Sequence, residues 1–288
     1  SLFNTSISSL NLQHRISGMS VLLLISRGGR LMSALVLVFT DQHLAINFAI
    51  VRAISTWFGL VISLYLIYRQ LQWTRFQPVV LWKNSSIYGF SEFIAIVYAQ
   101  VDVTLLALMV DRASIGNYAP AISLLNGLFI LPNAIYNLLI PALSRELPGK
   151  WERAQNKFTL AIVGWTALGL VLWAGLYWGG GWLISMLLGD EYQFAGELIR
   201  ILSPIILIKS VEFGLAALLI AVGWQQKRLI PQLFSALLII GLDLMVIPMY
   251  GPIGAAIVYV VCELILLAGY LLLAIDWWRS FKKTKVNT

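Results

Sequence analysis

Residues 144–178 read SRELPGKWERAQNKFTLAIVGWTALGLVLWAGLYW, a short basic connection followed by an apolar stretch. The connection carries Arg145, Lys150, Arg153 and Lys157, and the apolar stretch is long enough to cross a lipid bilayer. A helix that crosses the bilayer needs about 20 mostly apolar residues. The same alternation of apolar stretch and short connection recurs along the chain, and it predicts a protein that crosses a membrane many times.

The basic residues alternate between successive connections. One set of connections holds fourteen Lys and Arg residues, whereas the alternate set, around Asp41, Asp111, Asp190 and residues 249–252, holds only Arg112. The fourteen are Arg15, Arg69, Arg75, Lys83, Arg145, Lys150, Arg153, Lys157, Lys227, Arg228, Arg279, Lys282, Lys283 and Lys285. Because cytoplasmic connections accumulate Lys and Arg, we expect both ends of the chain on the cytoplasmic side.

The composition predicts an all-α integral membrane protein. Hydrophobic residues make up 59% of the chain and charged residues 11%, against about 25% charged in soluble domains. In lipid only helices and closed barrels satisfy the backbone, and the ten-residue alternating segments of a barrel are absent. We expect eight helices, at 16–40, 44–68, 84–108, 115–142, 157–178 (with a short helix continuing to 188), 198–223, 229–247 and 253–275.

Several classes of function are excluded by composition. The net charge of +7 is explained by membrane topology and anionic lipid, so no nucleic-acid partner is expected. The single Cys262 rules out an internal disulfide, and with only His14 and His43 no Cys/His metal cluster can form. The nucleophile elbow, the Walker loop and the Gly-rich dinucleotide loop are all missing, so no catalytic residue is expected.

Two predicted helices carry polar stripes. The members are Ser85, Tyr88, Glu92, Ala95, Tyr98 and Asp102 in one helix and Ser123, Asn126, Asn133 and Asn137 in the next. Residues spaced by three or four share a helix face, and Pro120 and Pro132 can bend the second helix. Such stripes line a water-filled cavity or hydrogen-bond between packed helices, and the sequence leaves both interpretations open.

Ten ionisable residues fall inside the expected spans. They are Arg27, Arg30, Arg52, Glu92, Asp102, Arg200, Lys209, Glu212, Asp243 and Glu263. Each costs roughly 2.5 to 3.5 kcal/mol at mid-membrane if it faces lipid, so it must face the interior, pair or snorkel. Asp102 or Glu92 could bind a coupling cation or proton, and no other cofactor is expected.

The cluster Ser26-Arg27-Gly28-Gly29-Arg30 is the clearest candidate anion site. Two guanidiniums three residues apart share a face, and the glycines between them let a bulky group approach, which suits a diphosphate. The alternative is a structural ion pair with Glu212 or Glu263. Lys209 and Glu212 are also three residues apart and can pair within their own helix.

Five short motifs resemble one known family. They are VDVTLL (101–106), IGNYAPA (115–121), IPALSR (140–145), LGDEY (188–192) and YGPIGAA (250–256). In this order and spacing they resemble the polysaccharide biosynthesis proteins, the O-antigen-type (Wzx-type) flippases of the multidrug/oligosaccharidyl-lipid/polysaccharide exporter superfamily. The resemblance covers roughly residues 84–275, and the first 80 residues fit by topology alone.

The resemblance implies a two-lobed bundle of twelve helices around a central cavity, of which this chain would hold the last eight. Since the chain begins at Ser1 rather than Met, we expect residues 1–14 to be a connection from a missing N-terminal part. Residues 15–69 would then be two helices of the first lobe and 70–83 a basic cytoplasmic linker. The six-helix second lobe would occupy 84–275, and 276–288 would be a basic cytoplasmic tail.

The function that the resemblance implies is translocation of an undecaprenyl-diphosphate-linked oligosaccharide across the bacterial inner membrane by alternating access. Polysaccharide-assembly proteins and membrane lipids would be partners. The cavity of such proteins is cationic, which gives an anion-binding role to Arg27, Arg30, Arg52 and Lys209. Coupling or polar cavity roles fall to Glu92, Asp102, Asn126, Asn133, Glu212 and Glu263.

Two alternatives stay open. A multidrug antiporter or a peptidoglycan-precursor flippase of the same superfamily would have nearly the same topology. A membrane-embedded polymerase, ligase or acyltransferase would be an enzyme, but such enzymes need a sizeable outer loop or a membrane His site. Here the outer connections have at most about ten residues, with only His43 available, so we expect a transporter and not an enzyme.

Overall fold

The computed structural model describes residues 54, 57, 61, 78–147 and 151–286. The chain separates into two compact units, Ser1–Trp82 and Lys83–Thr288. Almost all of the first unit lies outside the described residues, and with it the predicted spans 16–40 and 44–68. The fold described below is therefore that of the second unit, together with the start of its first helix.

All the regular structure in the described residues is helical. The elements are α4 (Pro78–Met109), α5 (Arg112–Leu128), α6 (Ile130–Glu146), α7 (Trp151–Leu188), the 3₁₀ turn η1 (Asp190–Tyr192), α8 (Gln193–Leu202), α9 (Pro204–Ala221) and α10 (Gln225–Val286). Four helical stretches of this part of the chain are long and apolar enough to cross a membrane: Ser114–Glu146, Trp151–Leu188, Pro204–Ala221 and Gln225–Phe281. This is a multi-pass membrane protein, while the number of eight spans stays a prediction.

Two of the predicted spans are broken by proline. The span predicted at 115–142 is split between α5 and α6 at Phe129, three residues before Pro132, whose ring nitrogen has no hydrogen to donate to the preceding turn. The span predicted at 198–223 begins earlier, as α8, and breaks where Pro204 occupies the first turn of α9. Proline at that position has the right φ and lacks only a donor that would be unpaired anyway.

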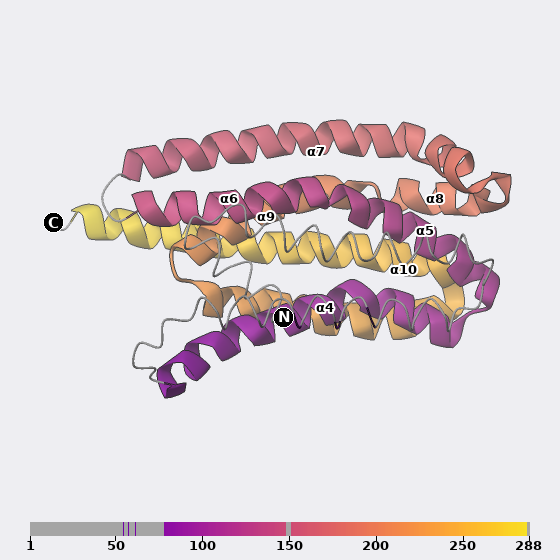
Figure 1. The fold of residues 1–288 in the computed structure, drawn as a ribbon, viewed down its shortest axis with the longest axis horizontal. Helices are drawn as coiled ribbons and strands as arrows, with labels where there is room; N and C mark the ends of the chain where they lie inside the picture. The colour runs from indigo at the N-terminus through magenta and orange to yellow at the C-terminus, as the bar shows by residue number, and fades with distance from the viewer. Residues whose placement is uncertain (1–53, 55–56, 58–60, 62–77, 148–150, 287–288) are drawn as a thin grey trace. The chain divides into compact units, whose positions relative to one another are not determined.

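Helix α10 contains two helices that run in opposite directions. Gly251 has φ 53° and ψ −139° and interrupts the helix, a conformation with positive φ that glycine adopts without steric cost. The two halves lie side by side, because a Cβ on Gly269 would lie only 2.5 Å from Cβ of Pro231. The predicted spans 229–247 and 253–275 correspond to these two halves, which are the light-orange and yellow segments of α10 in Figure 1.

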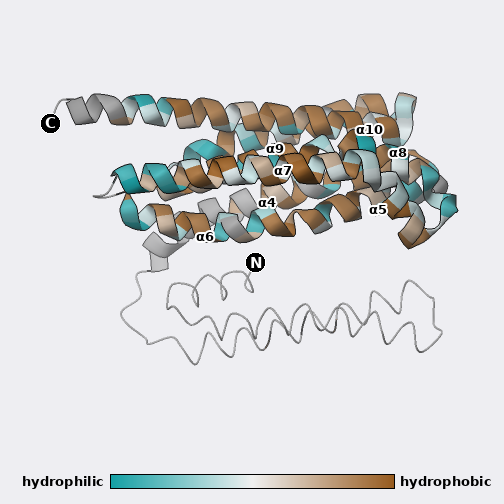
Figure 2. Cartoon of the chain, turned by 90° about the horizontal axis from the view of Figure 1, so that it is seen from above, coloured by the Kyte–Doolittle hydropathy of each residue, from teal (hydrophilic) through white to brown (hydrophobic). Residues whose placement is uncertain are grey.

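Helix α9 is the centre of the unit. It packs against α6, α7 and α10. Of its residues, 61% are buried, compared with 17% of the residues in the most apolar stretch of α7. Helix α7 lies along the outside, and its exposed residues include Leu160, Val171 and Trp182. Figure 2 shows helices that are mostly hydrophobic along their middles, with hydrophilic segments near their ends. This distribution suits a bundle whose solvent is lipid.

The connections alternate between two ends of the unit, as the charge pattern predicts. The end of α6, the start of α7, the end of α9 and the end of α10 meet in one apolar cluster that includes Leu143, Ala154, Leu218 and Trp277. We call this the basic end, since Arg145, Arg153, Lys157, Lys227, Arg228 and Arg279 all belong to it. The turns at 110–111, 189–192 and Gly251 lie at the opposite end (Figure 1).

Candidate functional site

Asp102 is a buried carboxylate held by a neighbouring helix. It lies on α4 with only 2% of its surface exposed, and its Oδ2 accepts a hydrogen bond from the hydroxyl of Tyr118 at 2.5 Å. Its Oδ1 accepts one from the backbone N–H of Val103 at 2.8 Å. Because α4 and α5 are joined by a tight turn at 110–111, residues at equal distances from that turn face each other.

Asp243 is a second buried carboxylate close to the first. It lies in the first half of α10 and is fully buried, and its charge interacts with that of Asp102. Within residues 78–147 and 151–286, neither of its carboxylate oxygens has a hydrogen-bond partner. A buried charge without partners is costly, and two carboxylates repel each other. A bound proton or a small cation would relieve both costs, which is the chemistry this carboxylate pair offers.

A second pair of buried carboxylates shares one ammonium group. Lys209 Nζ lies 3.0 Å from Oε2 of Glu212 on the same helix and 2.7 Å from Oε2 of Glu263 on α10. Its ammonium also lies 5.7 Å from the centre of the Tyr98 ring, so α4, α9 and α10 converge on it. The side chains of Lys209, Glu212 and Glu263 are 12%, 6% and 0% exposed. We call these three residues the charged triad.

The second polar stripe lies on the surface of the unit. Ser123 and Asn126 of α5 and Asn133 and Asn137 of α6 are all exposed, and the amide of Asn137 donates to the side chain of Asn133 within the same helix, at 3.1 Å. The exposed residues of α5 whose side chains are described are Gly116, Ser123, Asn126 and Gly127. We call this the polar face of α5. It differs from the exposed side of α7, which is largely apolar.

The other predicted site residues fall outside what the structure describes. Arg27, Arg30 and Arg52 lie outside the described residues, and Glu92 lies on α4 with a side chain that is not described. The structure thus brings together Lys209, Glu212 and Glu263, and it leaves Asn126 and Asn133 exposed on α5 and α6. The predicted pairing of Lys209 with Glu212 is confirmed.

Sequence reasoning missed the grouping of Asp102 with Tyr118 and Asp243. A signal for it was present, because Asp102 precedes the end of α4 and Asp243 precedes the turn at Gly251 by about two helical turns each. Both turns lie at the same end of the unit, so the two carboxylates sit at matching depth. Tyr118 belongs to the motif IGNYAPA, two turns into α5 from that same end.

Comparison with known proteins identifies the fold of this chain but no family. No family model matches the chain, and no curated protein matches its sequence. Among solved structures, the chain is similar to the lipid II flippase MurJ in an inward closed conformation, with a TM-score of 0.68 and 15% sequence identity. The match covers 96% of this chain and 59% of that structure. The chain therefore has a MurJ-like fold over a little more than half of the length of that flippase.

Proposed function

We propose that this chain is part of a flippase that moves an undecaprenyl-diphosphate-linked oligosaccharide across the bacterial inner membrane by alternating access. The observation that carries the proposal is the polar face of α5. In a membrane protein, glycine, serine and asparagine on an otherwise apolar bundle face a neighbouring helix, water or a polar ligand, and we propose that this face lines a water-filled cavity. The exposed side of α7, by contrast, is suited to acyl chains.

In this proposal the polar face of α5 forms one wall of the transport cavity. The MurJ-like fold supports alternating access as the mechanism. A polar headgroup enters such a cavity near the middle of the bilayer, and the lobes rock around it while the lipid tail stays in the membrane. Asn126 and Asn133 would hydrogen-bond the sugars. Arg27, Arg30 and Arg52 would hold the diphosphate, since guanidiniums bind phosphate oxygens in pairs.

The buried carboxylates would serve coupling and stability separately. Asp102 and Asp243 would take up the coupling proton or Na⁺, because no described cation neutralises them. The charged triad is already paired, so Lys209 contributes to anchoring α9 to α10 and only indirectly to anion binding. Nothing in this mechanism makes or breaks a covalent bond, and the proposal is for a transporter and not an enzyme.

Two glycines give a matched test of the cavity. Gly127 on the polar face and Gly175 on α7 are both exposed, with no atom within 4 Å of a Cβ built there. In the intact protein, Gly127→Leu should lower transport of lipid-linked oligosaccharide at least severalfold in reconstituted vesicles while the melting temperature is kept. Gly175→Leu should change neither. Equal transport in the two variants would remove the cavity from the proposal.

The proposed anion site needs its own variant. Replacing Arg27 and Arg30 together by Gln should abolish the appearance of lipid-linked oligosaccharide in the outer leaflet while the protein still inserts. Unchanged transport in the double variant would show that these guanidiniums do not bind the diphosphate.

A second candidate substrate is favoured by the structural comparison. The solved structure that this chain resembles is a lipid II flippase, and lipid II is also a lipid-linked precursor. Competition in the same vesicles separates the two substrates. Inhibition of oligosaccharide transport by excess lipid II, together with direct lipid II flipping, would assign the chain to the peptidoglycan precursor.

A further inference from the structure

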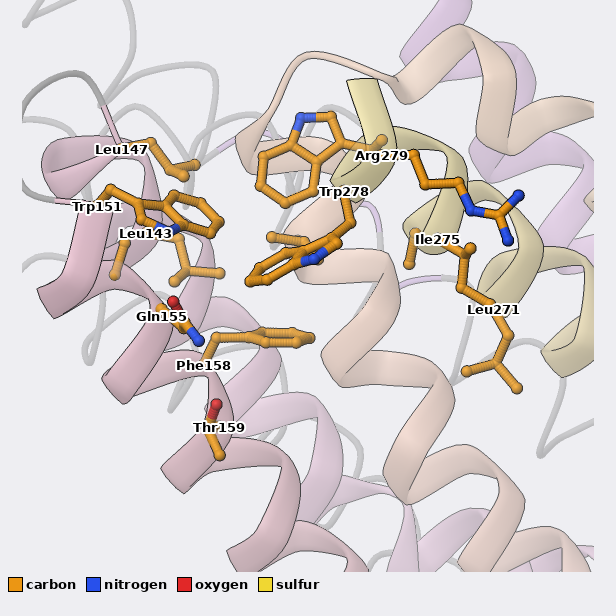
Figure 3. Close-up of a pocket in the computed structure, with 14 residues that line it drawn as sticks. Leu143, Leu147, Trp151, Gln155, Phe158, Thr159, Leu271, Ile275, Trp278 and Arg279 are labelled. Atoms are coloured by element: carbon orange, nitrogen blue, oxygen red, sulfur yellow. The ribbon is translucent and has the colours of Figure 1, made fainter. Parts of the chain in front are cut away.

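A cleft lined by aromatic rings lies at the basic end, away from the buried carboxylates. It has a volume of about 380 Å³, within the range of roughly 300 to 1,000 Å³ typical of small-molecule sites. Trp151 and Phe158 of α7 and Trp277 and Trp278 of α10 belong to its lining. We call it the aromatic cleft. Figure 3 shows residues of α7 on one side of the cleft and residues of α10 on the other.

Both walls of the aromatic cleft follow from helical periodicity. Trp151, Gln155 and Phe158 recur on one face of α7, and Leu271, Ile275 and Arg279 recur on one face of α10. The rings hold these walls together, because Trp151 lies 5.3 Å from Trp277 and 4.3 Å from Phe281, measured between ring centroids. Aromatic pairs at such distances stabilise packing beyond the area that they bury.

The lining suits an alkyl chain that ends in an anionic group. Apart from the indole N–H groups, the polar side chains of the lining are Gln155, Thr159 and Arg279, and Arg279 is the only charged one. Lys282 and Lys283 follow Arg279 within one turn of α10. Tryptophan is enriched at the boundary between acyl chains and headgroups, which is the depth expected for the end of a bundle.

Charge at the basic end selects the kind of lipid. Among the described side chains, the basic end holds more cations than carboxylates. The three carboxylates are Glu146, Glu152 and Asp276, and the six cations are Arg145, Arg153, Lys157, Lys227, Arg228 and Arg279. Glu146 is paired with Lys157, and Asp276 lies 4.0 Å from Lys227. Among the described residues, Arg279 forms no ion pair with a carboxylate. A phosphate is the complementary partner, since guanidinium binds phosphate oxygens strongly.

We propose that the aromatic cleft binds one anionic phospholipid from the leaflet at the basic end. An acyl chain would lie between α7 and α10 against Trp151 and Ile275, and the phosphate would contact Arg279. The lipid would tie the start of α7 to the end of α10. This site is distinct from the polar face of α5 and holds whether or not the chain is a flippase.

The test uses the intact protein in mild detergent and native mass spectrometry. Phosphatidylglycerol and phosphatidylcholine with the same acyl chains are added separately, and the bound lipid is counted. We expect one tightly bound phosphatidylglycerol and weaker binding of phosphatidylcholine. Arg279→Gln should weaken phosphatidylglycerol binding about fivefold, as expected for one cation near an anionic headgroup. Gln155→Trp, which fills the cleft from an exposed position, should remove both lipids.

Arg153→Gln is the matched control. Arg153 is an exposed cation of the same end that does not line the cleft, so its replacement should leave lipid binding as in the wild type. Equal binding of the two lipids, unchanged binding in Arg279→Gln or in Gln155→Trp, or an equal loss in Arg153→Gln would each overturn the proposal. A dimer that Gln155→Trp dissociates would show that a second copy fills the cleft, and would overturn it as well.

Discussion

At the residue scale, the two carboxylate pairs differ in what neutralises them. Lys209 lies within 3.0 Å of both Glu212 and Glu263, whereas Asp102 has one hydroxyl partner and Asp243 has no hydrogen-bond partner among the described residues. Removing one partner of a buried ion pair is strongly destabilising, because it leaves a charge without compensation. A buried carboxylate that lacks a partner is free to take up a cation. We therefore expect loss of Lys209 to affect stability, and loss of Asp102 or Asp243 to affect coupling.

Removing the carboxylate of Asp102 should uncouple transport from the ion gradient. In vesicles with an imposed Na⁺ or proton gradient, we expect the wild-type rate to rise severalfold with one of the two gradients. Asp102→Asn should abolish that stimulation, because the remaining carboxylate no longer needs a cation to offset its neighbour. Asp190→Asn, at an exposed acid near the same end, should keep it. The same gradient dependence in Asp102→Asn would mark this carboxylate as structural.

Removing the shared ammonium should destabilise the protein. Lys209→Met leaves two buried carboxylates without their cation and should cost about 3 to 5 kcal/mol, the usual effect of breaking a buried pair. Adding Glu212→Gln and Glu263→Gln should restore most of the loss, since no buried charge then remains. Thermal unfolding in detergent measures both effects. A Lys209→Met variant that melts with the wild type would show that the triad contributes nothing to stability.

Only some of the contacts between these charged residues could be predicted from the sequence, for a physical reason. The pairing of Lys209 with Glu212 is local, because residues three apart on a helix are neighbours, and it could be predicted. Glu263 meets Lys209, and Asp243 lies near Asp102, only through packing between helices that are distant in the chain. Helical periodicity gives the face of a residue but not the neighbouring helix, so these contacts required the structure.

At the element scale, glycine decides how closely α7 approaches its neighbours. A Cβ on Gly169 would lie 2.6 Å from Oγ of Ser210 and 3.2 Å from Cα of Leu207, both on α9. Small residues let helices pack closely in membranes, where burial of apolar surface gives little driving force. The approach of α7 to the central helix therefore depends on this position.

A larger side chain at Gly169 should separate α7 from α9. Gly169→Leu should cost about 1 to 3 kcal/mol, as overpacking does in tight cores, and should lower the melting temperature in detergent. Gly164→Leu is the control, since Gly164 is an exposed position of the same helix with no atom within 4 Å of a built Cβ. Equal melting temperatures for the two variants would contradict the close packing described here.

Three successive glycines lie inside α7. The sequence predicts a span at 157–178 and a short helix that continues to 188, with Gly179, Gly180 and Gly181 between the two, although glycine favours helix poorly. The helix nevertheless runs to Leu188. A Cβ on Gly180 would lie 2.8 Å from Cγ2 of Ile199 on α8, and a Cβ on Gly196 of α8 would lie 3.0 Å from Cα of Gly181, so Gly180 and Gly196 allow the close contact between α7 and α8. Tertiary packing overrides their low helix propensity.

At the scale of the whole molecule, the charge asymmetry and the fold agree. Within the described second unit, the ends of α6, α9 and α10 and the start of α7, next to the basic connections, meet at the basic end, and the turns of the other set lie at the opposite end. Helix α7, with 38 residues, is roughly 57 Å long and exceeds the hydrocarbon thickness of about 30 Å. It is therefore long enough for its two ends to reach opposite sides of the bilayer.

The orientation can be measured because the chain has a single cysteine. Cys262→Ala gives a background without thiols, into which Asn156→Cys near the basic end or Gln193→Cys near the opposite end is introduced. Both positions are exposed amides, so the two variants differ mainly in the end of the unit at which the cysteine lies. A membrane-impermeant maleimide added to intact cells should label Gln193→Cys at once and Asn156→Cys only after permeabilisation, because Lys and Arg accumulate on the cytoplasmic side. The reverse pattern would place the basic end outside, and the diphosphate would then have to enter from the other leaflet.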